Sequence, residues 1–161
     1  GTMRWLSIAA THNLPRMVSV QNEYSLLCRF FDLDMAEVAH HEQVGLLAFS
    51  PLAAGLLSGK YRGNTTPEGS RRTFAADLGK RITERMWPAV DAYIAIAEKA
   101  GISPAQLAIS WASSRPFMTS VIIGATTESQ LAEALSAQDI SLDDEVLAAI
   151  SETHKAHPMP F

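Results

Sequence analysis

Three short apolar runs, each followed by a turn-forming or polar segment, interrupt an otherwise mixed chain. They cover residues 17–21, 46–49 and 120–123. A short apolar run rich in β-branched residues and bounded by turn residues is typical of a strand buried on both faces. The pattern therefore predicts three strands, separated by long segments of different periodicity.

Those separating segments carry apolar residues at intervals of three and four, which is the spacing of an amphipathic helix. Ser103 and Gln106 have the spacing of a capping box at a helix N-terminus, and so do Thr127 and Gln130. The predicted helices cover residues 3–11, 34–43, 82–100, 104–113, a segment that begins after Thr127, and a last segment through about residue 155.

The alternation of strands with helices predicts one α/β domain over residues 1–161, with three parallel strands joined by right-handed crossovers. The most polar stretch, residues 63–80, contains Pro67, Gly69 and Gly79 after its first residue, Gly63. We expect it to form a long excursion over one end of the fold.

The amino-acid composition and net charge exclude several classes of function. Of the 161 residues, 47% are hydrophobic and 19% charged, which is typical of a globular domain. The formal net charge of −4 argues against a nucleic-acid partner, and no apolar run reaches the length of a membrane span. The single cysteine, Cys28, excludes an internal disulfide and favours a reducing cytoplasm.

Candidate binding residues follow each predicted strand. Gln21 ends the first, Phe49 and Ser50 end the second, and Gly124 follows the third. In parallel α/β folds, ligands bind beyond the carboxyl ends of the strands. Gly124 and the following helix N-terminus could form an anion site or an ordinary βα turn, and this stretch alone favours neither. Together, an amide, an aromatic ring, a glycine-containing loop and a helix N-terminus suit a nucleotide with a flat ring and phosphates.

The motifs at these positions resemble the C-terminal half of an aldo-keto reductase. They are VSVQNEYSLL from Val18, LAFSPLAAGLLSGKY from Leu47, and VIIGATTESQL from Val121. The likeness covers essentially the whole chain and is greatest to the branch that includes potassium-channel β subunits. It implies a partial (β/α)8 TIM barrel from an oxidoreductase family that binds NADPH and passes hydride to a carbonyl.

The resemblance also implies a role for particular residues. Gln21 would bind the nicotinamide carboxamide, and Phe49 would stack on the nicotinamide ring. The loop that holds the pyrophosphate would contain Ser50, Leu52, Gly55, Ser58 and Lys60. The adenosine and 2′-phosphate end would contact Gly124, Thr126, Gln130 and Glu133. Ala134 replaces the asparagine usual in the family, and no basic residue directly follows Gly124, so NADH is an alternative to NADPH.

The family's catalytic Asp, Tyr, Lys and His segments have no counterpart here, so no catalytic residue is assigned. Tyr61 lies beside Lys60, but adjacent residues on an extended loop point apart. We therefore expect no carbonyl reduction by this chain alone. The alternative function is a non-catalytic nucleotide-binding or self-assembly module, such as a truncated gene would produce.

Two further signals have simple interpretations. His154 and His157 suggest a metal pair, but without a third ligand they favour surface positions, and no metal site is predicted. We expect Arg71 and Arg72 to be exposed to solvent. The alternative is that they belong to a lid that clamps a phosphate group.

Three strands cannot close a barrel, so the side chains on the barrel-interior face would lack an opposite wall. Depending on register, these are Val18, Val20, Leu47, Phe49, Val121 and Ile123. Leaving ~1,000 Å² of apolar surface in water forgoes about 25 kcal/mol of gross stabilisation, more than the net stability of a typical domain. We therefore expect either a homo-oligomer or docking onto a missing N-terminal half-barrel.

Overall fold

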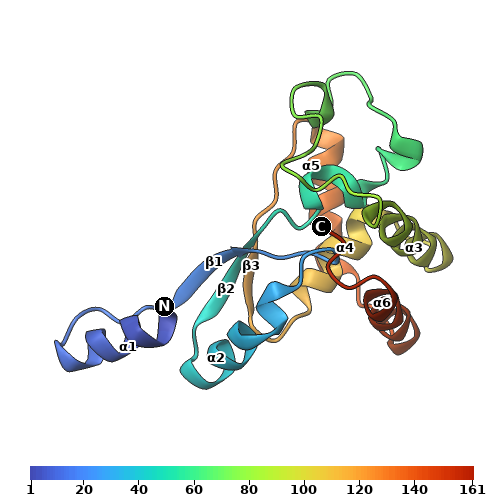
Figure 1. The fold of residues 1–161 in the computed structure, drawn as a ribbon. Helices are drawn as coiled ribbons and strands as arrows, with labels where there is room; N and C mark the ends of the chain where they lie inside the picture. Colours follow the sequence, from blue (N-terminus) through green and yellow to red (C-terminus); the bar gives the residue numbers. More distant parts are fainter.

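The computed structural model describes all 161 residues as helices packed on one side of a small sheet (Figure 1). The helices and strands are α1 (Thr2–Thr11), β1 (Ser19–Glu23), α2 (Asp34–Glu42), β2 (Gly45–Phe49), α3 (Met86–Lys99), α4 (Pro104–Ser113), β3 (Met118–Val121), α5 (Glu128–Ser136) and α6 (Asp144–Ala156). None of the helices combines the length and apolar character needed to cross a bilayer.

The sheet is parallel, in the order β1-β2-β3, and it is open rather than closed. This confirms the predicted α/β class and the partial barrel. β1 begins and ends two residues later than expected, and β3 two residues earlier. The bounds differ because a strand extends only as far as it pairs with its neighbour. Leu47 of β2 pairs with Gln21 of β1 on one side and with Ser120 of β3 on the other, and this register sets where β1 and β3 begin and end.

One face of the sheet packs against the helices. Leu46 and Ala48 of β2 are fully buried there, in a core shared with α3, α4 and α6. Behind the sheet, the buried Trp111 stacks on Tyr24 with ring centroids 5.3 Å apart. Val20 and Val121 also pack against this core, although we expected them on the barrel-interior face. The register places them opposite Leu46 and Ala48, and a one-residue change of register exchanges the faces.

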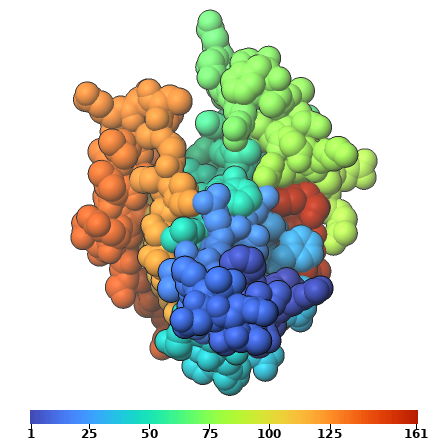
Figure 2. Space-filling view, turned by 90° about the vertical axis from the view of Figure 1, so that its left-hand side faces the viewer, coloured from blue at the N-terminus to red at the C-terminus, as the bar shows by residue number.

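The other face of the sheet has no covering layer. Phe49 is 36% exposed there, and Gln21 and Ser120 are exposed beside Leu47. Figure 2 shows this side: a hollow runs between the orange segment from β3 to α5 and the green polar segment, with the blue α1 below it. We call this surface the open face.

The polar excursion lies above the strand ends, as expected, and contains short 3₁₀ turns at Arg62–Asn64 and Arg71–Thr73 (Figure 1). Helix α3 begins at Met86 rather than at residue 82. Thr83 explains the difference, because its Oγ1 accepts a hydrogen bond from the Met86 N–H at 3.2 Å and ends the preceding loop.

The two predicted capping boxes differ. At α4, the Ser103 hydroxyl accepts from the Gln106 N–H, and the Gln106 side chain accepts from the Ser103 N–H. At α5, Thr127 accepts from the Gln130 N–H, but the Gln130 side-chain oxygen bonds to Thr126 instead. Only the first is a complete box.

Candidate functional site

The carboxyl ends of the three strands meet at one edge of the sheet, below the polar excursion (Figure 1). In the register of β1 and β2, Gln21 lies beside Leu47, and Glu23 lies beside Phe49. Because side chains alternate along a strand, Gln21 and Phe49 project from the same face, which is the open face. The structure therefore brings together the predicted amide and the predicted aromatic ring.

The loop after β2 has an unusual backbone. Ser50, Ala53 and Ala54 have φ of 56°, 47° and 58°, and Gly55 follows at 97°. Each non-glycine residue in this left-handed region costs about 1–2 kcal/mol. The turn is closed by bonds from the Ala53 N–H to Ser50 O at 2.8 Å and from the Gly55 N–H to Leu52 O at 2.9 Å. Successive N–H groups converge in such a concave turn, and here those of Gly55 and Leu57 both donate to Leu52 O, so the chain's own carbonyl occupies the concavity.

Gly55 also allows Lys60 to approach this loop. A Cβ on Gly55 would lie 2.7 Å from Lys60 Cε and 3.3 Å from Tyr61 Cε2, so no larger residue fits without displacement. Ser58 fixes the turn, because its hydroxyl donates to Gly55 O at 2.8 Å. The Lys60 ammonium is thereby held beside the concave turn, where it adds a positive charge.

The third segment, after β3, is wholly open. Nothing lies within 4 Å of the position that a Cβ on Gly124 would occupy. Thr126 donates to Gln130 Oε1 from both its N–H, at 3.0 Å, and its hydroxyl, at 3.1 Å. The Gln130 amide nitrogen makes no such bond, and Glu133 is exposed one turn later in α5. This segment offers the N-terminus of α5 and two free side-chain ends to a ligand.

Tyr61 is buried in the core and its neighbour Lys60 is exposed, but the two side chains do not point apart as expected, because Lys60 Nζ lies 5.2 Å from the centroid of the Tyr61 ring. Arg72 lies over the rings of Tyr61 and Trp87, at 5.7 and 5.9 Å from their centroids. Its guanidinium also donates to Thr65 O at 2.7 Å and to Asn64 Oδ1 at 2.9 Å. Arg72 is thus half-buried and stabilises the excursion, while Arg71 is exposed as predicted.

Sequence reasoning missed one ion pair at the strand ends. Arg81 donates to both carboxylate oxygens of Glu23, with three contacts of 2.8 to 3.0 Å. The guanidinium also lies 5.9 Å from the ring centroid of Phe161. The partners are 58 residues apart, and although Glu23 lies within the first motif, Arg81 belongs to none, so no local pattern indicated the pair.

The titratable groups with shifted pKa values lie elsewhere. Burial, together with a hydrogen bond to Asp32, raises the pKa of Tyr24 far above its ordinary value. Burial raises the pKa of Tyr93 to about 12, and burial also raises that of Cys28. Tyr24 and Tyr93 belong to the core behind the sheet, so neither phenol can act on a ligand at the open face.

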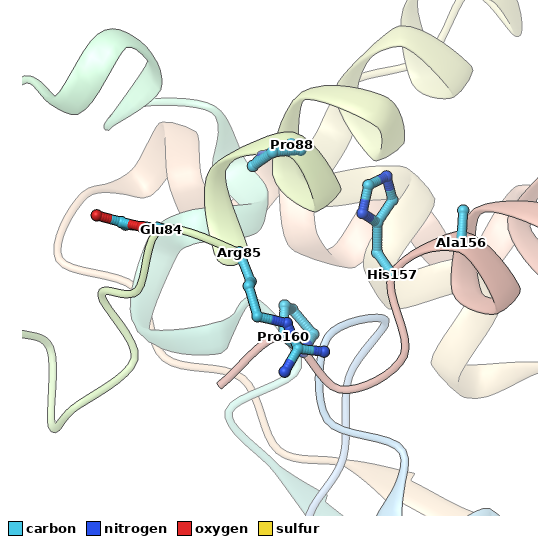
Figure 3. Close-up of a pocket in the computed structure, with 6 residues that line it drawn as sticks. All are labelled: Glu84, Arg85, Pro88, Ala156, His157 and Pro160. Atoms are coloured by element: carbon cyan, nitrogen blue, oxygen red, sulfur yellow. The ribbon is translucent and has the colours of Figure 1, made fainter.

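A pocket of about 320 Å³ lies between the start of α3 and the C-terminal tail (Figure 3). Its lining residues are Glu84, Arg85, Pro88, Ala156, His157 and Pro160. Arg85 lies beside Pro160 and donates to the carbonyl of Pro158 at 3.3 Å, while Glu84 points away. None of the predicted coenzyme residues lines this pocket, and no group of three or more His, Cys, Asp or Glu residues is placed to hold a metal ion.

Comparison with known proteins adds independent information. Residues 2–155 match the profile of the Aldo/keto reductase family. Protein tas of Escherichia coli is 41% identical over 160 residues, which cover 99% of this chain and 46% of that protein. A probable voltage-gated potassium channel subunit beta of Arabidopsis thaliana is 36% identical over 74% of this chain and 38% of its own length. An uncharacterized oxidoreductase of Bacillus subtilis, YrpG, is 32% identical over 84% of this chain and 40% of its own length. The chain therefore spans about half the length of these curated relatives, or less.

Proposed function

Because this chain belongs to the aldo/keto reductase family of oxidoreductases, we propose that it holds the nicotinamide coenzyme, NADPH, at its open face. When bound, NADPH would supply the hydride for carbonyl reduction. The observation that carries the proposal is the common placement of Gln21 and Phe49 on the open face, beside the left-handed turn and Lys60.

Each part of the site has a chemistry that suits one part of the coenzyme. An amide side chain such as Gln21 both donates and accepts, which matches a carboxamide, and the Phe49 ring offers a face for stacking. The exposed Lys60 ammonium beside the turn would supply a positive charge for the pyrophosphate, and Ser58 would hold the turn in place. The adenosine end would lie along Gly124, Thr126, Gln130 and Glu133, and Leu52 would pack beside the turn.

The distribution of charge favours an anionic ligand at this end of the molecule. Residues 60–85 contain seven Lys or Arg and three Asp or Glu, a net charge of +4, whereas the rest contains six and fourteen, a net charge of −8. The basic segment lies above the strand ends (Figure 1). Arg62 and Arg81 pair with acidic residues outside this segment, but Lys60, Arg71, Lys80 and Arg85 form no ion pair. A group of unpaired cations attracts polyanions such as NADPH even when the whole protein is acidic. It offsets the lack of a basic residue directly after Gly124.

We propose further that this chain alone does not reduce carbonyls. The family resemblance implies a tyrosine as proton donor, but Tyr24, Tyr61 and Tyr93 are all buried in the core. A proton donor must touch the substrate, so it would have to come from another segment or chain. The second candidate function, a non-catalytic nucleotide-binding module, shares this feature. The lone, buried Cys28 supports a reducing compartment such as the cytoplasm for either role.

Titration of the protein with NADPH, followed by coenzyme fluorescence, tests the proposed binding. Phe49→Ala and Gln21→Ala should each raise the dissociation constant about tenfold, since a loss of ~1.4 kcal/mol corresponds to that factor. Phe74→Ala, at an exposed position of the excursion, is the matched control and should leave affinity unchanged. Equal weakening by all three variants, or no NADPH binding by the parent protein, would refute the site.

Two further measurements sharpen the result. If the basic segment contacts the 2′-phosphate, NADH should bind more weakly than NADPH. Equal affinity for the two coenzymes would show that the protein does not contact the 2′-phosphate. Incubation with NADPH and simple aldehydes should give no turnover above the coenzyme's spontaneous oxidation. Turnover by the purified chain would contradict the external proton donor.

A further inference from the structure

The last residue of β1 places a carboxylate at the nicotinamide end of the proposed coenzyme site. Glu23 follows Gln21 by two residues and pairs with Phe49 in the register of β1 and β2. Because side chains alternate along a strand, Glu23 projects from the same face as Gln21 and Phe49. An unpaired carboxylate at this position would repel the anionic coenzyme, so its charge has to be neutralised by the protein.

The guanidinium of Arg81 neutralises this carboxylate with a two-pronged contact. Nε and Nη2 of Arg81 donate to Glu23 Oε1 at 3.0 and 2.8 Å, and Nη2 also donates to Oε2 at 2.8 Å. The remaining nitrogen, Nη1, donates to Leu78 O at 2.7 Å. All three nitrogens are therefore engaged by oxygens of the protein. A lysine cannot reproduce this fork, since its ammonium is a single point of charge. Arg81 thus acts on Glu23 and not as a ligand of the coenzyme phosphates.

The backbone before Arg81 is shaped around its guanidinium. Leu78, Gly79 and Lys80 are all in the left-handed region, with φ of 49°, 72° and 64°. A Cβ on Gly79 would lie 2.9 Å from Arg81 Nη1. Asp77 closes the turn, because its carbonyl accepts from the Arg81 N–H at 3.0 Å and its side chain accepts from the Gly79 N–H at 3.0 Å. A backbone of this kind persists only where its surroundings hold it, and it fixes the direction of the Arg81 side chain.

We propose that Arg81 is a positioning residue for the nicotinamide end of the coenzyme site. By holding Glu23, it fixes the end of β1 and thereby the placement of Gln21 and Phe49. This proposal rests on the proposed coenzyme site. A residue that only stabilised the fold would affect every part of the bound coenzyme alike. A positioning residue at the end of β1 affects the nicotinamide half alone.

Binding of the whole coenzyme and of its adenosine half separates these two roles. The probes are NADPH and 2′,5′-ADP, which retains the adenosine and the 2′-phosphate but lacks the nicotinamide. Arg81→Met should raise the dissociation constant of NADPH about tenfold, the same factor as loss of Gln21 or Phe49 itself, and change that of 2′,5′-ADP by less than about twofold. Glu23→Gln should show the same split. Arg81→Lys keeps the charge without the fork and should not restore NADPH affinity.

Two further variants exclude a general loss of stability. Ile150→Ala removes a buried side chain of α6 and is the destabilised control, which should bind NADPH as the parent protein does. The double variant Glu23→Gln/Arg81→Met should bind NADPH no more weakly than Arg81→Met alone, because the two residues act as one unit.

Three results would overturn the positioning role. They are unchanged NADPH affinity in Arg81→Met, equal weakening of NADPH and 2′,5′-ADP, and equal weakening of NADPH by Ile150→Ala. Absence of NADPH binding by the parent protein would instead refute the coenzyme site, and the positioning role with it.

Discussion

Arg81 connects segments that are far apart in the chain, because one guanidinium contacts both Glu23 at the end of β1 and the ring of Phe161. The side chains of Arg81 and Glu23 are only 17% and 23% exposed. Removal of the cation leaves a largely buried carboxylate without its partner, which costs more than loss of a surface pair. Arg81→Met should therefore lower the free energy of unfolding by about 1.5–3 kcal/mol, measured by urea denaturation.

The matched control for this prediction is Lys155→Met. Lys155 pairs with Glu152 at 2.6 Å, but both side chains are exposed. Its loss should change the unfolding free energy by less than about 0.5 kcal/mol. If the two variants destabilise the protein equally, the Glu23–Arg81 pair contributes no more than a surface ion pair.

We expect His154 of α6 to make the stability of the protein depend on acid pH. Burial, followed by the nearby positive charge of Arg29, lowers the pKa of this imidazole, and the charge of Asp32 opposes the shift. In the unfolded chain this histidine has its ordinary pKa of about 6.5, whereas in the folded chain the pKa is lower. As pH falls through 6.5, the unfolded chain therefore binds more protons than the folded chain, and the free energy of unfolding decreases. His154→Gln should reduce the loss of unfolding free energy between about pH 7.5 and 5, followed by urea midpoints. An unchanged loss in the variant would assign the acid sensitivity to other groups.

At the scale of elements, the capping box of α4 supports two helices. Ser103 and Gln106 satisfy each other's backbone N–H groups, and Gln106 Nε2 also donates to Ser136 Oγ of α5 at 2.9 Å. Ser103→Ala should cost about 1 kcal/mol in unfolding free energy, the usual value for an N-cap. Ser151→Ala, at an exposed position inside α6, should be neutral or slightly stabilising because alanine favours helix. The reverse order of effects would show that the cap is not needed.

Elements differ in how well the sequence predicts them, and the cause is physical. The α4 helix could be predicted because Ser103 and Gln106 act within one turn of the chain. The bounds of β1 and β3 could not, since strand ends depend on pairing with β2. For the same reason Val20 and Val121 lie on the helical face rather than on the open face. The site residues Gln21 and Phe49 could be placed together from their positions at strand ends, whereas the Glu23–Arg81 pair joins residues with no local relation.

At the scale of the whole molecule, the parallel sheet and its lack of closure could be predicted from three apolar runs and the chain length. What covers the open face depends on association, which no periodicity encodes. If two copies enclose it, unfolding is coupled to dissociation, and a tenfold rise in protein concentration should add about 1.4 kcal/mol to apparent stability. The urea midpoint should therefore rise between dilute and concentrated samples. A urea midpoint that does not change with protein concentration would argue for a monomer.

The contacts of residues 81–85 with the end of the chain have a consequence for motion. Thr83 Oγ1 donates to Pro160 O at 2.7 Å, and Arg85 Nη2 reaches Pro158 O, next to the contact between Arg81 and Phe161. Residues 81–85 and the tail cannot open separately without breaking these contacts. Their amide hydrogens should thus exchange with deuterium as one cooperative unit, with a shared opening free energy.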